Sequence, residues 1–144
     1  MADLSVTVTQ VVPDTSGEIR TGPAAAIIEA GEAVYFNESN QNWALADASA
    51  LATLNSGTKI GIAVSTANVA AQKLSVQVTG SPTIGAGASV AAGQTYVVSE
   101  TAGGIAEESD TGAAAFTCIL GIGNGSDGID MNAAGVLTAS TAHA

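Results

Sequence analysis

The stretch that decides the fold is AAGQTYVVSETAGGIA, residues 91–106, because an earlier stretch has nearly the same pattern. That earlier stretch is EAGEAVYFNESNQNWALA, residues 29–46. Each contains Ala-Gly followed by a polar residue, an apolar segment that holds a tyrosine, a polar turn and a short apolar return. Glycines in the second turn can adopt the positive φ that tight hairpins need. Each stretch therefore predicts a β-hairpin.

The two hairpins belong to a longer repeat. We interpret the chain as two copies of one β-unit, at about residues 25–80 and 86–140. Two copies are too few for a solenoid, but two units can pair their edges into one closed or nearly closed sheet. The landmarks that recur are Gly31 and Gly93 (offset 62), Tyr35 and Tyr96 (offset 61), residues 60–62 and 120–122 (offset 60), and residues 74–76 and 129–131 (offset 55).

Short segments rich in β-formers and separated by turn residues fill most of the chain, so we expect an all-β fold, either a small β-barrel or a sandwich. One segment differs: it has Leu45, Ala48, Leu51 and Leu54 at helical spacing, and Gly57 could end a helix. We therefore allow at most one short helix, over residues 45–57. The expected strands are residues 33–36, 43–46, 58–66, 73–80, 95–99, 105–109 and 114–125, with one or two more within 128–140.

The N-terminal residues 3–9, DLSVTVT, alternate strictly between apolar and polar side chains. This pattern predicts a half-buried strand with Leu4, Val6 and Val8 on one face. Such a strand can add to the sheet edge of a partner or sister subunit, or it can pair within its own domain, and the sequence favours neither. These three residues are the candidate contact residues.

A connector follows over residues 10–26, with two prolines, two glycines and several turn formers. The expected organisation is an N-terminal strand or arm with its linker, residues 1–24, and a single β domain, residues 25–144.

The charge balance excludes some partners. Three basic residues, Arg20, Lys59 and Lys73, stand against thirteen acidic ones, for a net charge of −10. So few cations cannot neutralise a nucleic acid backbone, and an anionic membrane would repel the chain. No acid lies between residues 48 and 99, whereas residues 100–110 hold four. Solvated acidic loops explain this best; a less charged middle that faces a partner is the alternative.

The composition predicts a thin core. The chain has 29 alanines and only five Phe, Trp or Tyr residues, and alanine buries little area. We therefore expect a partner or self-association to stabilise the fold.

The N-terminus lacks the pattern of a secretory signal, and no apolar run reaches the roughly 18 residues of a membrane span, so we expect synthesis in a cytoplasm.

A search for reactive groups favours a protein that is not an enzyme and holds no metal or cofactor. The only histidine, His143, is the penultimate residue, where chains are usually mobile. The only cysteine, Cys118, lies in an apolar run and is expected to be buried. A calcium loop at Asn124, Ser126, Asp127 and Asp130 is an alternative, but it lacks the full ligand pattern, so a simple turn is preferred.

Four segments carry a resemblance to a known family. They are AGEAVYF, GTKIGIAVSTA, AGQTYVVSETAGGIA and CILGIGNG, and their order and spacing cover roughly residues 25–135. Together they resemble the small capsid decoration, or cement, proteins of tailed bacteriophages. The resemblance implies a β-rich protein, often a trimer, on the outer face of the mature head, where it clamps neighbouring capsomers. It implies the major capsid protein lattice as partner, location in the virion and no catalytic residues.

Two functions follow as hypotheses. The first is a non-enzymatic decoration protein that stabilises the head, with the capsid as one possible partner for Leu4, Val6 and Val8. The second is a carbohydrate- or receptor-binding β-module of a fibre or adhesin, which would use exposed aromatics. The strand patterns around Tyr35, Trp43 and Tyr96 place these aromatics in the core instead. A small enzyme is the least favoured hypothesis.

Overall fold

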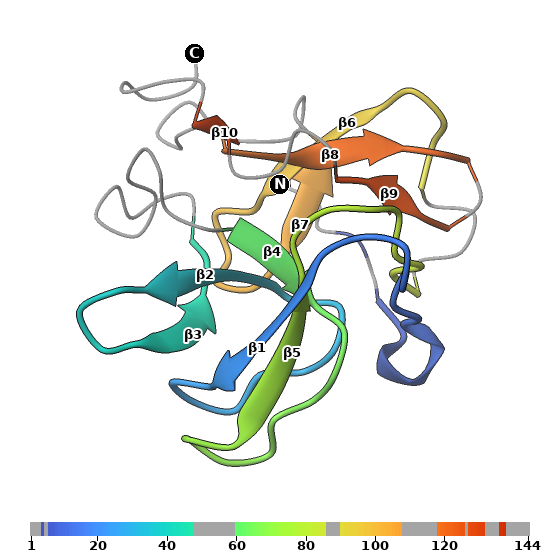
Figure 1. Ribbon diagram of the computed structural model, residues 1–144. Helices are drawn as coiled ribbons and strands as arrows, with labels where there is room; N and C mark the ends of the chain where they lie inside the picture. The colour runs from blue at the N-terminus through green and yellow to red at the C-terminus, as the bar shows by residue number, and fades with distance from the viewer. Residues whose placement is uncertain are drawn as a thin grey trace.

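The computed structural model describes residues 4, 6–47, 60–85, 90–107, 118–125, 127–131 and 136–137. These residues form antiparallel strands, one 3₁₀ turn and no α-helix, so the all-β prediction is confirmed (Figure 1). The elements are η1 (Val8–Gln10), β1 (Ile19–Pro23), β2 (Ala33–Asn37), β3 (Asn42–Leu45), β4 (Ile60–Ala63), β5 (Lys73–Gln77), β6 (Thr95–Val98), β7 (Ile105–Glu107), β8 (Cys118–Gly123), β9 (Ile129–Asp130) and β10 (Val136–Leu137).

The strands form two five-stranded sheets. The first has the order β1-β5-β4-β2-β3, and the second has the order β10-β8-β6-β7, with β9 also paired to β8. The blue and green first sheet fills the lower half of Figure 1, and the orange second sheet fills the upper half. The helix allowed over residues 45–57 begins at Leu45, which ends β3; residues 48–57 lie outside the described residues.

The two sheets contain the same unit twice. In the first, β2 pairs with β3 and β4, and β4 pairs with β5; in the second, β6 pairs with β7 and β8, and β8 pairs with β9. The turns before the first strands match too, because Gly31 and Gly93 both have positive φ. Gly31 N–H donates to Ala63 O at 2.7 Å, and Gly93 N–H donates to Gly123 O at 2.9 Å.

The register corrects two of the predicted equivalences. Val34 pairs with Gly61 where Tyr96 pairs with Gly121, so Val34, not Tyr35, is the counterpart of Tyr96. Burial agrees, since the side chains of Val34 and Tyr96 are both fully buried. Matching the two tyrosines by residue type, without regard to burial, therefore gave the wrong equivalence.

The second correction concerns the last strand of each unit. Ala63 pairs with Val76, and Gly123 pairs with Ile129, so Val76 and Ile129 are equivalent. The predicted alignment of residues 74–76 with 129–131 is therefore shifted by two positions. A two-residue shift keeps every side chain on the same face, so the apolar pattern alone could not reveal it.

The first unit also begins earlier than predicted. Residues 19–23, expected within an irregular connector, form β1 and pair along their whole length with β5. Thr21 lies opposite Ser75 in this pair, and the bridge between Thr83 and Gly128 is its counterpart in the second unit. Pro23 is tolerated because β1 is an edge strand, where one backbone N–H can be missing.

The strand predicted over residues 3–9 is wrong for the residues that the structure describes. Leu4 and Val6 belong to no strand, and Val8 begins the 3₁₀ turn η1. Single hydrogen bonds replace a ladder: Leu4 N–H donates to Ile105 O at 2.7 Å, and Thr7 N–H donates to Gly85 O at 2.8 Å. The segment thus folds back onto its own domain and meets the edge strand β7.

Two buried clusters form the core. The first joins the units, because it combines Ile60 and Ile62 of β4 with Tyr96 of β6 and side chains of the second sheet. The second lies within the first unit around Trp43, Leu74 and Val76. Strand β4 contributes to both clusters, so all four of its residues are buried, which explains its continuous apolar sequence.

Candidate functional site

The three predicted contact residues line one groove of about 250 Å³ beside the turn between β6 and β7. Leu4 is partly buried and packs against the first core cluster, so part of this apolar face is used inside the molecule. Leu4, Val6 and Val8 are therefore brought together, but their contact with a capsid or sister subunit stays a prediction. Residues 29–32 and 101–105 form the rest of the lining.

Glu32 is the chemically distinctive residue of this groove, and the sequence analysis missed it. Its Oε1 accepts the N–H of Glu29 at 2.7 Å. Burial raises the pKa of the Glu32 carboxyl, and the charge of Glu29 adds to the rise, while the Glu29 N–H bond opposes it. Gly103 (φ +81°) lies so close to Glu32 Oε2 that a side chain there would collide with it. The sequence signal that could have revealed Glu32 is an acidic residue between apolar residues at the start of β2.

A second cavity, of about 340 Å³, lies between β1 and β3 and is lined by Arg20, Thr21, Phe36 and Trp43. The Phe36 and Trp43 rings meet edge to face with centroids 5.2 Å apart. Arg20 Nε forms an ion pair with Glu18 Oε2 at 2.6 Å, and about half of each side chain is exposed. An exposed pair of this kind contributes little stability.

The aromatic residues are mainly structural, as the sequence predicted. Trp43 is only 2% exposed and Tyr96 is fully buried. The Tyr96 hydroxyl accepts the N–H of Ala91 at 2.8 Å, which satisfies its buried polar end. Tyr35 is half-buried and packs against the first core cluster.

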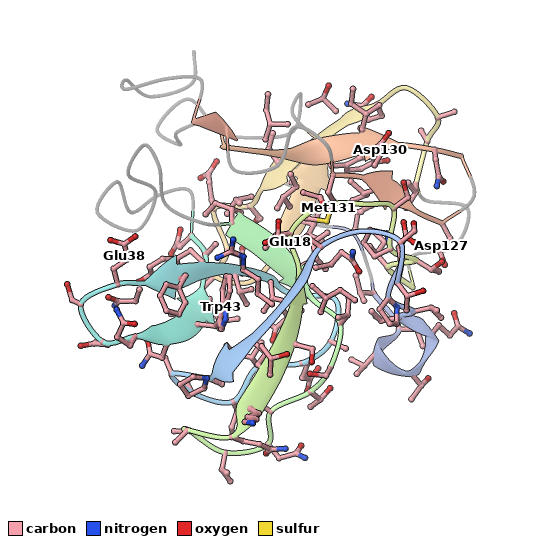
Figure 2. The ribbon with its side chains drawn as sticks, in the orientation of Figure 1. Glu18, Glu38, Trp43, Asp127, Asp130 and Met131 are labelled. Carbon is pink, nitrogen blue, oxygen red and sulfur yellow. The ribbon has the colours of Figure 1, made fainter. Side chains whose placement is uncertain are left out.

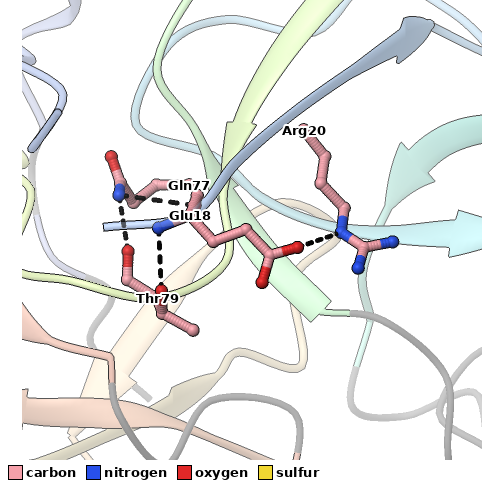
Figure 3. Close-up of polar contacts among 4 residues, drawn as sticks. All are labelled: Glu18, Arg20, Gln77 and Thr79. Atoms are coloured by element: carbon pink, nitrogen blue, oxygen red, sulfur yellow. Dashed lines mark hydrogen bonds and ion pairs between the residues drawn. The ribbon is translucent and has the colours of Figure 1, made fainter. Parts of the chain in front are cut away.

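Gln77, which is fully buried at the end of β5, organises the entry to β1. Its Oε1 accepts Asp14 N–H at 3.0 Å, and its Nε2 donates to the carbonyls of Asp14 and Thr79. Beside it, Thr79 Oγ1 accepts Glu18 N–H at 2.8 Å, as Figure 3 shows. The network is structural: it fastens residues 14–18 to the first sheet.

Asp14 anchors the same region from outside. Its carboxylate accepts the N–H and the hydroxyl of Ser16 and the N–H of Ser81. These hydrogen bonds, that of the Ser16 hydroxyl first, lower the pKa of Asp14. Together with Gln77, this carboxylate holds the segment before β1 in place.

The loop considered for calcium is a turn in the residues described. Asn124 Oδ1 accepts Gly128 N–H at 3.2 Å, and Asp127 has a φ of 63°. Ser126 lies outside the described residues. Figure 2 shows Asp127 and Asp130 on different parts of this region. Across the described ranges, no three His, Cys, Asp or Glu side chains gather where they could hold a metal ion.

An exposed apolar surface, not singled out from the sequence, lies on the loops that precede β2 and β5. We call residues 25–27 and 69–71 the apolar loop pair; all six are exposed. Ile27 is 63% exposed and Val69 is 61% exposed. Both segments are rich in alanine, and only their pairing in space reveals the surface.

Some predicted residues cannot be placed. His143, Lys59, Glu108 and Asp110 lie outside the described residues, and Cys118 begins β8 with a side chain that is not described. In the described part of the chain, no helix has the length and apolar character needed to span a membrane. Comparisons with known protein families, with curated proteins and with solved structures found no match.

Proposed function

We propose that this chain is a non-enzymatic capsid decoration protein of a tailed bacteriophage. In this proposal it binds the major capsid protein lattice on the outer surface of the mature head, as a homotrimer, and stabilises the shell. The observation that carries the proposal is where the four family-like segments lie. The segment AGEAVYF leads into β2 and covers most of it, and the segment AGQTYVVSETAGGIA contains β6. The segment GTKIGIAVSTA contains β4, and the segment CILGIGNG contains β8.

These are the equivalent central strands of the two units, so the resemblance follows the architecture and not only the alanine-rich composition. The charge supports the same function. A net charge of −10 favours solubility for a protein made in many copies and displayed to solvent. Binding of the folded form to a shell would also stabilise a fold with so many small core residues.

The test of the function is the stability of heads. Heads that carry the protein should withstand heating and chelator treatment that disrupts heads from which it has been removed, and adding the purified protein back should restore resistance. Equal survival of decorated and stripped heads would contradict the proposed role.

The alternative, a carbohydrate- or receptor-binding module, draws support from one feature, the cavity lined by Arg20, Thr21, Phe36 and Trp43. The burial of the Trp43 ring weighs against it, because sugars stack on exposed aromatic faces. Arg20→Ala is a better probe than a change at Trp43, since Arg20 is on the surface. Glycan-array binding that is lost in this variant would favour the alternative.

A further inference from the structure

The apolar loop pair is held in one shape by backbone hydrogen bonds at both ends. At one end, Ile28 N–H donates to Ala67 O at 3.1 Å, and Ala67 N–H donates to Ile28 O at 2.8 Å. At the other end, Ala24 N–H donates to Gln72 O at 2.9 Å, and Ala71 N–H donates to Ala24 O at 2.8 Å. The two loops lie together at the lower end of the view in Figure 1. A surface fixed in this way loses little conformational freedom on binding.

The apolar side chains of the pair face outward from a buried base. Ile28 and Ala67 are fully buried and Ala24 is 2% exposed, so the core beneath is already filled. Ile27 and Val69 lie on the surface above this base, and large apolar side chains exposed in one patch mark interaction sites.

The fold itself does not require this surface. Between the equivalent pairs Ala63–Val76 and Gly123–Ile129, the first unit has residues 64–75, which include the long loop 64–72, but the second has only residues 124–128. The same strands are thus joined by a short polar turn in the second unit. The extra loop length in the first unit is what carries Val69 outward.

The charge around the loop pair defines its partner. Residues 23–28 and 67–72 contain no charged side chain, although the whole chain carries −10. Glu29 and Lys73 are the nearest charged residues along the chain, one beyond each loop. A partner surface must therefore be apolar and uncharged at its centre, because buried unpaired charges are costly.

We propose that the apolar loop pair, and not the Leu4, Val6 and Val8 face, docks the protein onto an apolar, uncharged patch on the outer face of the head shell. This inference rests on the proposed function. A stable interface between two free proteins takes about 20–30 residues a side, so the six residues of the pair are too few to hold a second copy of this chain. In the homotrimer of the proposed function, however, three linked loop pairs would engage a symmetric lattice together, so that weak contacts add up through multivalency.

The test compares three proteins in binding to undecorated mature heads: wild type, Ile27→Ser with Val69→Ser, and Val12→Ser. Val12 is a control, because its side chain is 54% exposed and its bridge to Thr83 is made by backbone hydrogen bonds, which the substitution keeps. The loop-pair variant should lose roughly tenfold or more in affinity, whereas Val12→Ser should bind like wild type. Wild-type binding should change little with added salt, since the surface has no charge. Far-ultraviolet circular dichroism and melting temperature verify that each variant is folded.

The outcomes separate the two proposals. If wild type binds and the folded loop-pair variant binds equally well, the inference is wrong and the proposed function stands. If wild type does not bind undecorated heads, the proposed function fails and the inference fails with it. If the variant instead changes the mass of the free protein in sedimentation, the loop pair is a contact between subunits, which also overturns the inference.

Discussion

Gly61 and Gly121 occupy the same position in the two units, and each is needed for the same reason. A Cβ at Gly61 would lie 2.6 Å from Gln77 O, and a Cβ at Gly121 would lie 2.7 Å from Ile129 Cγ2. Real Cβ atoms do not approach other atoms this closely, so the neighbouring strand would have to move. The apolar-Gly-Ile motif is thus a packing requirement that both copies share.

Gly61→Ala and Gly121→Ala should each lower the free energy of unfolding by about 1–3 kcal/mol, because added volume in a packed interior strains the backbone. Urea denaturation measures the change. Ala26→Ser, at an exposed position, is the control and should stay within about 0.5 kcal/mol of wild type. Wild-type stability in both glycine variants would show that the strand pairs are looser than described.

Glu32 makes stability depend on pH. Burial raises its pKa above the ordinary 4.5, so the folded protein binds this proton more tightly than the unfolded chain does. The linkage relation then makes the contribution of Glu32 to stability fall as the pH rises from about 4.5 through the raised pKa. Glu32→Gln removes the titration and keeps an oxygen that accepts the Glu29 N–H.

We therefore expect Glu32→Gln to gain stability relative to wild type as the pH is raised from about 4 to about 7. Urea unfolding of both proteins across this range measures the difference directly, and the effects of titrating groups that do not interact with Glu32 cancel in it. A difference that stays constant with pH would contradict the partly buried position of this carboxyl.

At the scale of elements, the Gln77 network joins the segment before β1 to the end of β5. Gln77→Ala leaves the N–H of Asp14 without its acceptor and opens a cavity, which should cost about 2–4 kcal/mol. Hydrogen exchange should accelerate most in residues 14–18. Gln10→Ala, at the exposed end of η1, is the control and should change neither quantity. Unchanged exchange in the Gln77 variant would exclude the proposed fastening role.

The hairpins were predictable because their signals are local. The turn before β7 contains Gly103, whose φ is +81°, as the Gly-Gly pair indicated. Strand β1 was not predictable, since IRTGP lacks alternation and becomes a strand only against β5. The opposite error occurred at residues 3–9, which alternate well between apolar and polar side chains. Of these, the described residues 4 and 6–9 form no strand, and Leu4 and Thr7 have separate hydrogen-bond partners. In both cases, pairing partners that are distant in the sequence decided whether a strand formed.

The candidate surfaces, too, were predictable from the sequence only in part. The sequence identified Leu4, Val6 and Val8, and the structure gathers them around one groove. It missed Glu32, whose altered pKa arises from burial, and it missed the apolar loop pair, whose two segments lie some forty residues apart in the chain. Burial and pairing between distant segments belong to the folded molecule and leave little trace in a single sequence.

At the scale of the whole molecule, two copies of one antiparallel unit share a core cluster, and among the described residues the extended apolar loop lies in the first unit. The repeated unit forms the scaffold, and the long loop of the first copy contributes to the exposed surface of the apolar loop pair. Under the proposed function, this difference would let the molecule bind a repeating lattice in one orientation, because its two halves do not present the same face.

The most direct measurement of this account is a titration of undecorated mature heads with purified protein, with bound copies counted by sedimentation and located by electron microscopy. The account predicts saturation at a fixed number of copies per head, all at symmetry-related positions on the outer surface. Absence of binding, or unsaturable binding at scattered positions, would contradict it.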